Sequence, residues 1–215
     1  MPHPDWNESY LSAAPPPWDT GSVEPQLLEL WNAQRLPRGR ALEVGCDTGT
    51  NAVWLAQQGY DVVAVDIAPA AIERARRRAA AANVRCRFAA LDFLSDRIDE
   101  RPFDLVFDLG CFHVFDTPQE QRRFAERVAG LLAPKGLWVS LIGSTEGGPR
   151  EMGPPRRSAR DVVNAIEPSL EIRELSATHF ELGPLGNPAA WRCISARREV
   201  PAQPSTADRM DGPRT

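Results

Sequence analysis

Short apolar runs recur along most of the chain, and segments with helical character separate most of them. Five of these runs predict strands, at residues 41–45, 61–66, 84–89, 103–108 and 137–142, with a helix after the first, the second and the fourth. The run Asp61–Asp66 is almost continuously apolar, which is typical of parallel strands buried on both faces. Two further runs, 170–180 and 190–197, follow each other without a full helix between them. They predict an antiparallel hairpin at one edge of the sheet.

The segments between these runs carry the start and stop signals of helices. Pro69 stands where a helix can begin, and Gly59 supplies a helix stop. The predicted helices span residues 25–36, 51–58, 70–82, 118–132 and 159–166. Strands that alternate with helices imply right-handed crossovers and a sheet covered on both faces. We therefore expect an α/β fold, a Rossmann-like three-layer sandwich whose seven-stranded, mostly parallel sheet has one antiparallel edge hairpin.

The two ends of the chain differ from the middle in composition. Residues 1–25 are rich in proline and tryptophan, and three consecutive prolines exclude a helix there. Trp6 and Trp18 would be costly on a solvated tail, so we expect this N-terminal arm to dock on the domain, which spans residues 26–198. Residues 199–215 have the composition of a disordered tail.

Composition narrows the class of protein. Hydrophobic residues make up 42% and charged residues 25%, which suits a globular chain and excludes collagen, a coiled-coil rod and a wholly disordered protein. The formal net charge of −4 disfavours a nucleic-acid partner. No apolar run approaches the roughly 18 residues of a membrane span, and the first residues lack the pattern of a secretory signal. We therefore expect no membrane association and a cytoplasmic location.

The cysteines indicate neither a metal site nor a disulfide framework. All four are widely separated, and no two form a Cys-x-x-Cys pair: Cys46, Cys86, Cys111 and Cys193. A zinc site would require closely spaced Cys and His pairs. The sequence therefore predicts reduced thiols and no bound metal, and it leaves the oligomeric state open.

Chemistry is expected beyond the carboxyl ends of the parallel strands, where open α/β sheets bind their ligands. The first strand runs into Glu43-Val44-Gly45-Cys46-Asp47-Thr48-Gly49, a glycine turn before a helix that offers unpaired N–H groups. Asp66 ends the second strand, and an acid there can accept hydrogen bonds from ribose hydroxyls. Asp92 follows the third strand and Asp108 ends the fourth. Acids at successive strand ends predict a nucleoside ligand.

The glycine spacing distinguishes between two motifs that bind different nucleoside cofactors. A dinucleotide motif, Gly-x-Gly-x-x-Gly, would need glycine at positions 45, 47 and 50, but the chain has Asp47 and Thr50. The spacing instead resembles the acidic-x-Gly-x-Gly-x-Gly pattern of the class I S-adenosylmethionine-dependent methyltransferases. Glu43, Gly45 and Gly49 match that pattern, and Asp47 replaces its middle glycine. Aspartate is among the residues that tolerate a left-handed backbone.

This resemblance covers about residues 15–197 and implies S-adenosylmethionine as cofactor, with S-adenosylhomocysteine as product. It implies that Asp66 binds the ribose, that Asp92 and Phe93 meet the adenine amino group and ring, and that Asp108 lies near the methionine moiety. The cofactor-binding residues that we expect on this basis are Trp18, Glu43, Gly45, Cys46, Gly49, Asp66, Ile67, Asp92, Phe93 and Asp108.

Two further segments resemble the small-molecule thiol methyltransferases of the thiopurine, halide/thiol and tellurite-resistance types. They are Pro17-Trp18-Asp19-Thr20-Gly21 in the arm and Asp108-Leu109-Gly110-Cys111-Phe112-His113 after the fourth strand. The resemblance implies that the arm folds over the cofactor, with Trp18 near the sulfonium and Asp19 holding the arm. An alternative for Trp18 is simple packing under the arm. Many relatives have arginine where this chain has Leu109, which disfavours thiopurines and acidic substrates.

A small-molecule thiol is the acceptor that this resemblance favours. Methyl transfer from a sulfonium is an in-line displacement, to which the protein contributes alignment and removal of water. His113 is the candidate catalytic base, because imidazole titrates near neutral pH and the loop after the fourth strand faces the site. The alternative is a structural histidine beside Phe112 and Phe115. Methylation of a hydroxyl or amine of a natural product, or a non-catalytic cofactor-binding module, are the alternative functions.

The loop 143–158, rich in glycine, proline and arginine, is the predicted lid over the acceptor. Its arginines, Arg150, Arg156 and Arg157, allow two interpretations: they steer an anionic substrate, or they form a solvated charge run. A lid with few aromatic residues and many prolines favours a small acceptor pocket over a protein or nucleic-acid groove.

Overall fold

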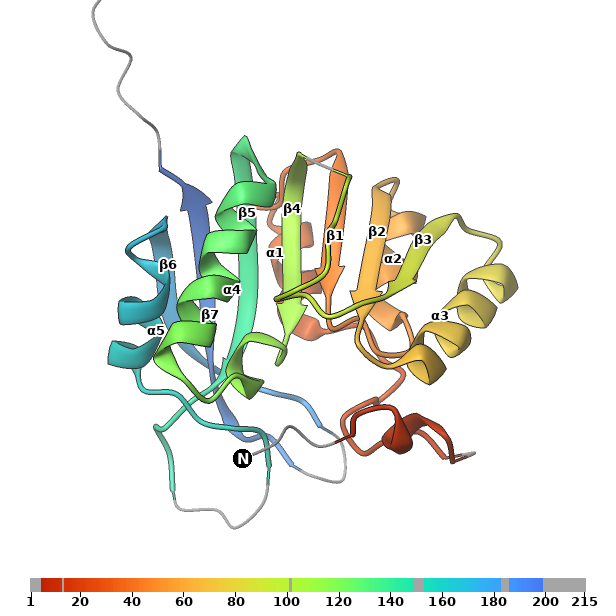
Figure 1. The fold of residues 1–215 in the computed structure, drawn as a ribbon, viewed down its shortest axis with the longest axis horizontal. Helices are drawn as coiled ribbons and strands as arrows, with labels where there is room; N and C mark the ends of the chain where they lie inside the picture. Colours follow the sequence, from red (N-terminus) through yellow and green to blue (C-terminus); the bar gives the residue numbers. More distant parts are fainter. Residues whose placement is uncertain (1–4, 13, 101, 149–152, 183–185, 199–215) are drawn as a thin grey trace, which may run out of the picture.

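The computed structural model describes residues 5–12, 14–100, 102–148, 153–182 and 186–198. Within these ranges seven strands form one sheet in the order β3-β2-β1-β4-β5-β7-β6 (Figure 1). Strands β1 to β5 run parallel, and β7 lies antiparallel between β5 and β6. The strands are β1 (Arg40–Val44), β2 (Asp61–Asp66), β3 (Cys86–Ala90), β4 (Phe103–Leu109), β5 (Leu132–Gly143), β6 (Leu170–His179) and β7 (Ala189–Arg197). The predicted mostly parallel sheet with an antiparallel edge hairpin is confirmed.

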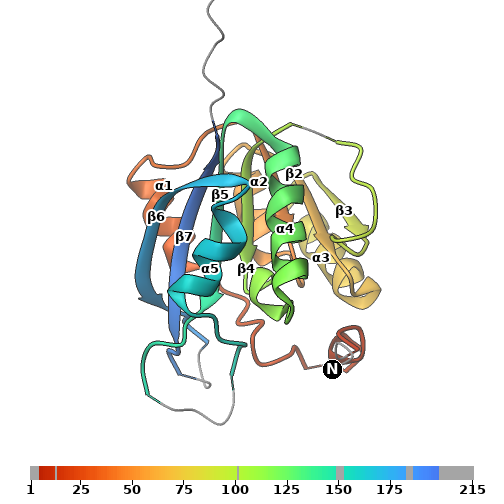
Figure 2. The same cartoon turned by 60° about the vertical axis from the view of Figure 1, so that its left-hand side comes forward.

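Helices cover both faces of this sheet, as Figure 2 shows, with α4 and α5 in front of it and α1 and α2 behind. The helices are α1 (Pro25–Asn32), α2 (Thr50–Gln57), α3 (Pro69–Ala81), α4 (Pro118–Leu131) and α5 (Ala159–Ile166), with single 3-10 turns η1 (Glu8–Tyr10) and η2 (Phe112–Val114). Phe124 and Ile166 belong to the hydrophobic core on one face of the sheet. Leu30, Leu55 and Ile72 belong to the core on the other face. Within the described ranges, no helix has the length and apolar character to cross a membrane.

Two predicted boundaries are wrong because left-handed residues interrupt the chain. The first helix ends at Asn32 rather than at Leu36, since Gln34 takes a φ of 56° that a right-handed helix does not allow. The third strand begins at Cys86, two residues later than predicted, after Asn83 with a φ of 52°. Both residues act as helix stops in place of glycine, and asparagine is one of the types that adopt this conformation most readily.

The fifth strand is also longer than predicted and begins directly after α4, at Leu132 instead of residue 137. Leu132 pairs with Phe103, and the register shifts between Phe103 and Leu105. Gly136 allows this irregular stretch to lie close to β4, because a Cβ at that position would stand 2.7 Å from the Phe103 carbonyl oxygen. The turn residues at 134–136 thus form an irregularity inside the strand.

The order of the strands determines where a ligand can enter. β1 has β2 on one side and β4 on the other, so the strand order reverses there. The carboxyl ends of these three strands open at one edge of the sheet, which is the usual ligand-binding edge of such folds. The N-terminal arm, red in Figure 1, lies below this edge.

Candidate active site

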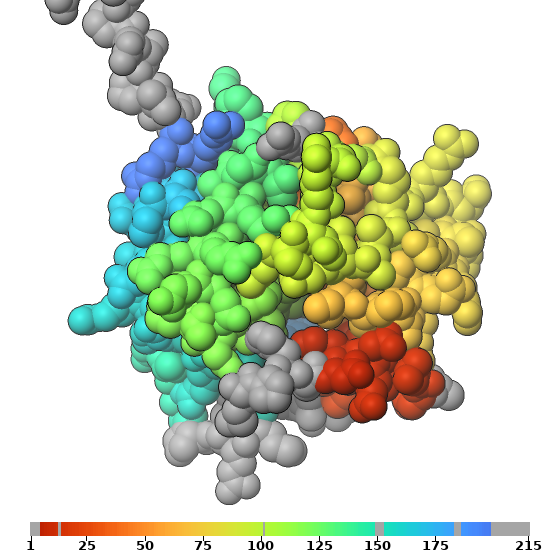
Figure 3. Space-filling model, viewed as in Figure 1, coloured from red at the N-terminus to blue at the C-terminus, as the bar shows by residue number. Residues whose placement is uncertain are grey.

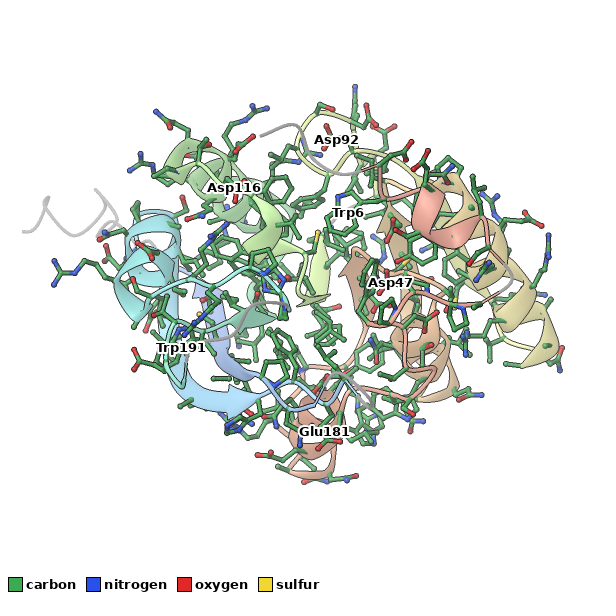
Figure 4. All side chains as sticks on the ribbon, turned by 90° about the horizontal axis from the view of Figure 1, so that it is seen from below. Trp6, Asp47, Asp92, Asp116, Glu181 and Trp191 are labelled. Carbon is green, nitrogen blue, oxygen red and sulfur yellow. The ribbon has the colours of Figure 1, made fainter. Side chains whose placement is uncertain are left out.

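A cavity of about 920 Å³ lies at the carboxyl edge of the sheet. Its wall includes Trp6 and Trp18 from the arm, Asp66 and Asp92 from the strand ends, and Phe180 after β6. Figure 4 looks onto this edge and labels Trp6, Asp47 and Asp92 around the cavity, and Figure 3 shows the arm packed against the body of the molecule. Sites of roughly 300–1,000 Å³ enclose a drug-sized ligand, so the cavity can hold a nucleoside together with a second small molecule.

Two glycines shape the loop after β1, because each has a left-handed φ and little space for a Cβ. Gly45 has a φ of 69°, and a Cβ there would stand 2.8 Å from the Cβ of Cys111. Gly49 has a φ of 78°, and its Cβ would stand 2.8 Å from that of Ala75 on α3. Asp47, between them, has a φ of 48°. The backbone of this loop therefore lies against the cavity at Gly45 and against α3 at Gly49.

Asp66 joins this loop to the turn that follows β2. Its Oδ2 accepts a hydrogen bond of 2.9 Å from the Asp47 N–H, and its Oδ1 accepts one of 2.9 Å from the Ala68 N–H. Asp66 is buried, and this burial raises the pKa of its carboxyl. The two loops that flank the cavity are thus held by one carboxylate.

Asp47 turns its own carboxylate toward the arm. It accepts a hydrogen bond from the Tyr10 hydroxyl, and the Trp18 Nε1–H donates to that hydroxyl oxygen at 3.1 Å. Burial, and then the neighbouring charge of Asp66, raise the pKa of Asp47 to about 7. Tyr10, Trp18 and Asp47 all line the cavity.

Asp92 shapes the turn after β3. Its Oδ1 accepts from the Leu94 N–H and its Oδ2 from the Ser95 hydroxyl, both at 2.8 Å. The neighbouring Phe93 is buried, with its ring 4.6 Å from that of Phe124. Asp92 and Phe93 therefore present a carboxylate and an aromatic surface side by side in the cavity wall.

Asp108 is completely buried behind the cavity and organises the segment after β4. Its carboxylate accepts from the Phe112 N–H at 2.9 Å, from the Cys111 N–H at 3.2 Å and from the Trp138 Nε1–H at 2.9 Å. Burial raises the pKa of this carboxyl to about 6. These bonds hold η2, and with it His113, at the rim of the cavity.

Glu43, a residue of β1, is likewise buried behind the cavity wall, near the starts of α1 and α2. Its Oε1 accepts from the Asn51 Nδ2 at 3.2 Å, and the Asn51 Oδ1 accepts from the Glu24 N–H at 2.9 Å. Burial raises the pKa of Glu43 to about 8. The side chain thus connects β1 to the start of α2 and, through Asn51, to the start of α1.

His113 lines the cavity with a defined ring orientation. Its Nδ1 accepts a hydrogen bond of 2.7 Å from the Gly143 N–H at the end of β5. The ring stands edge-on to Phe180, with centroids 5.8 Å apart. A nitrogen that accepts a hydrogen bond carries no hydrogen, so in the neutral imidazole the hydrogen is on Nε2.

The two described arginines of the loop 143–158 bind backbone carbonyls of that loop and of the segment after β4. Arg156 Nε donates to the Ser144 carbonyl at 2.9 Å. Arg157 Nη2 donates to the carbonyls of His113 and Phe115, each at 2.8 Å. Arg157 is therefore neither a solvated charge nor a cation poised for substrate, and both interpretations from the sequence are wrong for it. Arg150 and the predicted tail, 199–215, lie outside the described residues.

Comparison with known proteins places this geometry in a family. Residues 41–136 match a family model described as a methyltransferase domain. A relative from Arabidopsis thaliana, "Probable thiol methyltransferase 2", is 35% identical over 149 residues, which are 67% of this chain and 65% of that protein. The chain thus covers slightly less than two thirds of the relative.

Solved structures agree with this assignment. The structure described as "Conversion of a Disulfide Bond into a Thioacetal Group during Echinomycin Biosynthesis" superposes with a TM-score of 0.74 at 25% identity, over 85% of both chains. The N-methyltransferase NodS from Bradyrhizobium japonicum WM9, in complex with S-adenosyl-L-homocysteine, has a TM-score of 0.68 at 20% identity and shares the fold, over 89% of this chain and 96% of that one. Residues 41–136 therefore match a methyltransferase domain, and the fold of the described residues is the one seen in S-adenosylmethionine-dependent methyltransferases of class I.

The cavity wall includes most of the residues that the sequence singled out. They come from the arm, the first three strand ends and η2: Trp18, Gly45, Asp66, Ile67, Asp92, Phe93 and His113. The remaining predicted residues are not part of the wall and lie in or behind the loops that form it: Glu43, Cys46, Gly49 and Asp108.

The sequence did not reveal how the N-terminal arm is attached to the domain. Asn7 Oδ1 accepts from the Ala70 N–H at 2.9 Å, and Asp19 Oδ2 accepts from the Thr48 hydroxyl at 2.7 Å. The second of these contacts agrees with the predicted holding role of Asp19. Tyr10 was not singled out, since it lies in an irregular segment without periodicity.

Proposed function

We propose that this protein transfers the methyl group of S-adenosylmethionine to the sulfur of a small-molecule thiol. The observation that carries the proposal is a cavity with two chemically different ends. Asp66 and Asp92 come from the ends of β2 and β3 on one side of β1, and His113, Phe115 and Phe180 come from the segments after β4 and β6 on the other side. The similarity to a probable thiol methyltransferase supports sulfur as the acceptor atom.

The acidic end fits the cofactor. Asp66 accepts from the backbone N–H groups of Asp47 and Ala68, and a carboxylate with about four acceptor positions keeps about two of them for ribose hydroxyls. We assign Asp92 and Phe93 to the adenine amino group and ring, and we assign Ile67, which also lines the cavity, to contact with the same ring. In the wall, Trp18 supplies an aromatic surface that suits a sulfonium.

The four predicted residues behind the wall act through the loops. Glu43 and Gly49 fix the backbone after β1, together with the adjoining Cys46, and Asp108 fixes η2. We therefore assign them to positioning the cofactor loops rather than to touching the cofactor.

The apolar end of the cavity is the part that we assign to the acceptor thiol. S-adenosylmethionine, when bound, supplies a methyl group on a positively charged sulfur. The aromatic and proline wall, which includes Phe115, Phe180 and Pro155, removes water from the acceptor thiol. A thiol is already a few per cent ionised at neutral pH, so the site needs alignment more than a strong base.

We assign His113 a different part from the base that its sequence position indicated. Since the Gly143 N–H occupies Nδ1, the hydrogen on Nε2 can be donated to the sulfur of the acceptor. Such a bond orients the sulfur and favours its thiolate form. The thiol proton leaves to solvent.

Purified protein is expected to bind S-adenosylhomocysteine in a calorimetric titration and not to bind nicotinamide dinucleotides. With S-adenosylmethionine, benzenethiol is expected to release S-adenosylhomocysteine at least about 100-fold faster than phenol, because far more of the thiol is ionised. Faster turnover of phenols or amines would replace sulfur with oxygen or nitrogen as acceptor. Binding without turnover of any acceptor would favour a non-catalytic module, and binding of the dinucleotide alone would refute the cofactor assignment.

The role of His113 can be tested with two variants. His113→Phe is expected to lower kcat/KM for benzenethiol by about 10- to 100-fold, the value of one hydrogen bond to a charged group. His113→Gln keeps a side-chain N–H donor and is expected to retain most of the activity. A base role predicts instead that glutamine is as damaging as phenylalanine, and the affinity for S-adenosylhomocysteine serves as the control for an intact cavity.

A further inference from the structure

Asp47 stands where the family pattern has its middle glycine, and its side chain reaches the arm. We propose that Asp47 is a positioning residue that fastens the N-terminal arm over the cofactor end of the cavity through Tyr10. The inference rests on the proposed function only in taking this end of the cavity as the cofactor site. It concerns retention of the cofactor and is independent of the identity of the acceptor.

The connection is a continuous chain of contacts from the loop to the arm. The Tyr10 hydroxyl donates to the Asp47 carboxylate, and the Trp18 Nε1–H donates to the same hydroxyl at 3.1 Å. The ring of Trp6 packs edge-on against Trp18 with centroids 5.8 Å apart. Tyr10 is only 3% exposed, so its hydroxyl is shielded from competing water. One carboxylate therefore orients three aromatic side chains of the arm.

The position of Asp47 opposes folding in three ways. Its φ of 48° is easier for glycine than for aspartate. Its carboxylate is partly removed from water, and the charge of the adjacent Asp66 repels it, both of which raise its pKa. Glycine at this position would relieve all three costs, and it would leave the Tyr10 hydroxyl without its acceptor. Stability of the fold thus favours glycine at position 47, whereas attachment of the arm favours aspartate.

The arm has other attachments, so losing this one should loosen it without releasing it. Asn7 is bonded to the Ala70 N–H on α3, and Asp19 is bonded to Thr48. The Tyr10 contact lies between these two points in the sequence and faces the cavity. Trp6, Tyr10 and Trp18 form the arm side of the wall, across from the strand ends. An arm that moves away at its middle opens a path for the cofactor to leave.

The decisive variant is Asp47→Gly, with Asn83→Gly as its matched control. Asn83 also has a left-handed φ, of 52°, and lies in the turn between α3 and β3 outside the cavity wall. For Asp47→Gly we expect the dissociation constant of S-adenosylhomocysteine to rise about tenfold or more, the value of a charge-assisted hydrogen bond. We expect the ligand-free melting temperature to stay the same or rise. Asn83→Gly should leave the dissociation constant unchanged.

Tyr10→Phe should reproduce the loss of affinity, and the double variant should bind no more weakly than Asp47→Gly alone, because both remove the same contact. Hydrogen exchange of the arm, residues 5–20, reports the attachment without any ligand. It should accelerate in Asp47→Gly and remain unchanged in Asn83→Gly.

The outcomes separate this inference from the proposed function. If wild-type protein fails to bind S-adenosylhomocysteine but Asp47→Gly frees the arm, the cofactor assignment fails and the fastening role stands. If the wild type binds and Asp47→Gly changes neither the affinity nor the exchange of the arm, the fastening role is overturned. Additive losses in the double variant would likewise overturn it, since they would place Asp47 and Tyr10 in separate interactions.

Discussion

Replacing Asp66 by alanine is expected to weaken binding of S-adenosylhomocysteine by about 100-fold or more, and with it the turnover of S-adenosylmethionine. Two hydrogen bonds from ribose hydroxyls to a charged acceptor, at about 1.5–3 kcal/mol each, account for this size. The variant also removes the acceptor for the Asp47 and Ala68 N–H groups, which loosens the loops on both sides of the cavity. Calorimetric titration measures the loss of affinity.

The same strand offers a matched control for this experiment. Asp61 begins β2 at the opposite end and forms exposed ion pairs with Arg40 and Arg87. Surface pairs of this kind contribute about 0–1 kcal/mol, so Asp61→Ala should bind the cofactor product normally. Asp66→Asn, which keeps one acceptor oxygen, should lose less affinity than Asp66→Ala. Binding by a folded Asp66→Ala variant within threefold of the wild type would remove Asp66 from the cofactor site.

The second large effect concerns pH. In the ligand-free protein, the free energy of unfolding should fall as the pH rises from 5 to 8.5. Burial raises the pKa of Glu43 to about 8 and those of Asp47 and Glu24 to about 7. Between the unfolded pKa values near ~4 and these folded values, the native state binds more protons than the unfolded chain. Stability present at low pH is therefore lost as these carboxyls ionise.

Glu43→Gln should flatten this profile. The glutamine oxygen can still accept from the Asn51 Nδ2, and the side chain no longer has to ionise in the core. We expect the variant to exceed the wild type by a few kcal/mol at pH 8.5 and to differ little from it at pH 5. Chemical denaturation at both pH values measures the difference. Glu126→Gln, at an exposed position on α4, is the control that should keep the wild-type slope. An unchanged slope in Glu43→Gln would show that ionisation of this buried carboxyl is not the cause of the pH dependence.

Much of the fold could be predicted because it follows from local patterns. The nearly continuous apolar run of β2 indicated a parallel strand buried on both faces, and Pro69 and Gly59 marked helix boundaries correctly to within a few residues. The start of β5 could not be predicted, because it depends on the pairing of Leu132 with Phe103, a tertiary contact. Residues 118–132 have high helix propensity, and Pro134-Lys135-Gly136 has the composition of a turn, so both favoured a start of the strand at residue 137.

The residues of the candidate site, too, could be predicted only in part. Topology brings strand-end residues to one edge, which is why Asp66 and Asp92 were predicted and do line the cavity. Topology does not determine which way a strand-end side chain points. Asp108 points into the core toward Trp138. Tyr10 and Asp47 are 37 residues apart, and no periodicity connects an irregular arm to a loop.

The placement of β7 has a consequence for how the chain reaches its native state. Among the described strands it is synthesised last, yet it lies inside the sheet, and β6 joins the sheet by pairing with it. Until Ala189–Arg197 has left the ribosome, β5 is an unpaired edge whose residues, such as Val139 and Leu141, are apolar. An open apolar edge is a template for pairing with another chain. The interval between synthesis of β5 and of β7 is therefore when the nascent protein is most exposed to aggregation.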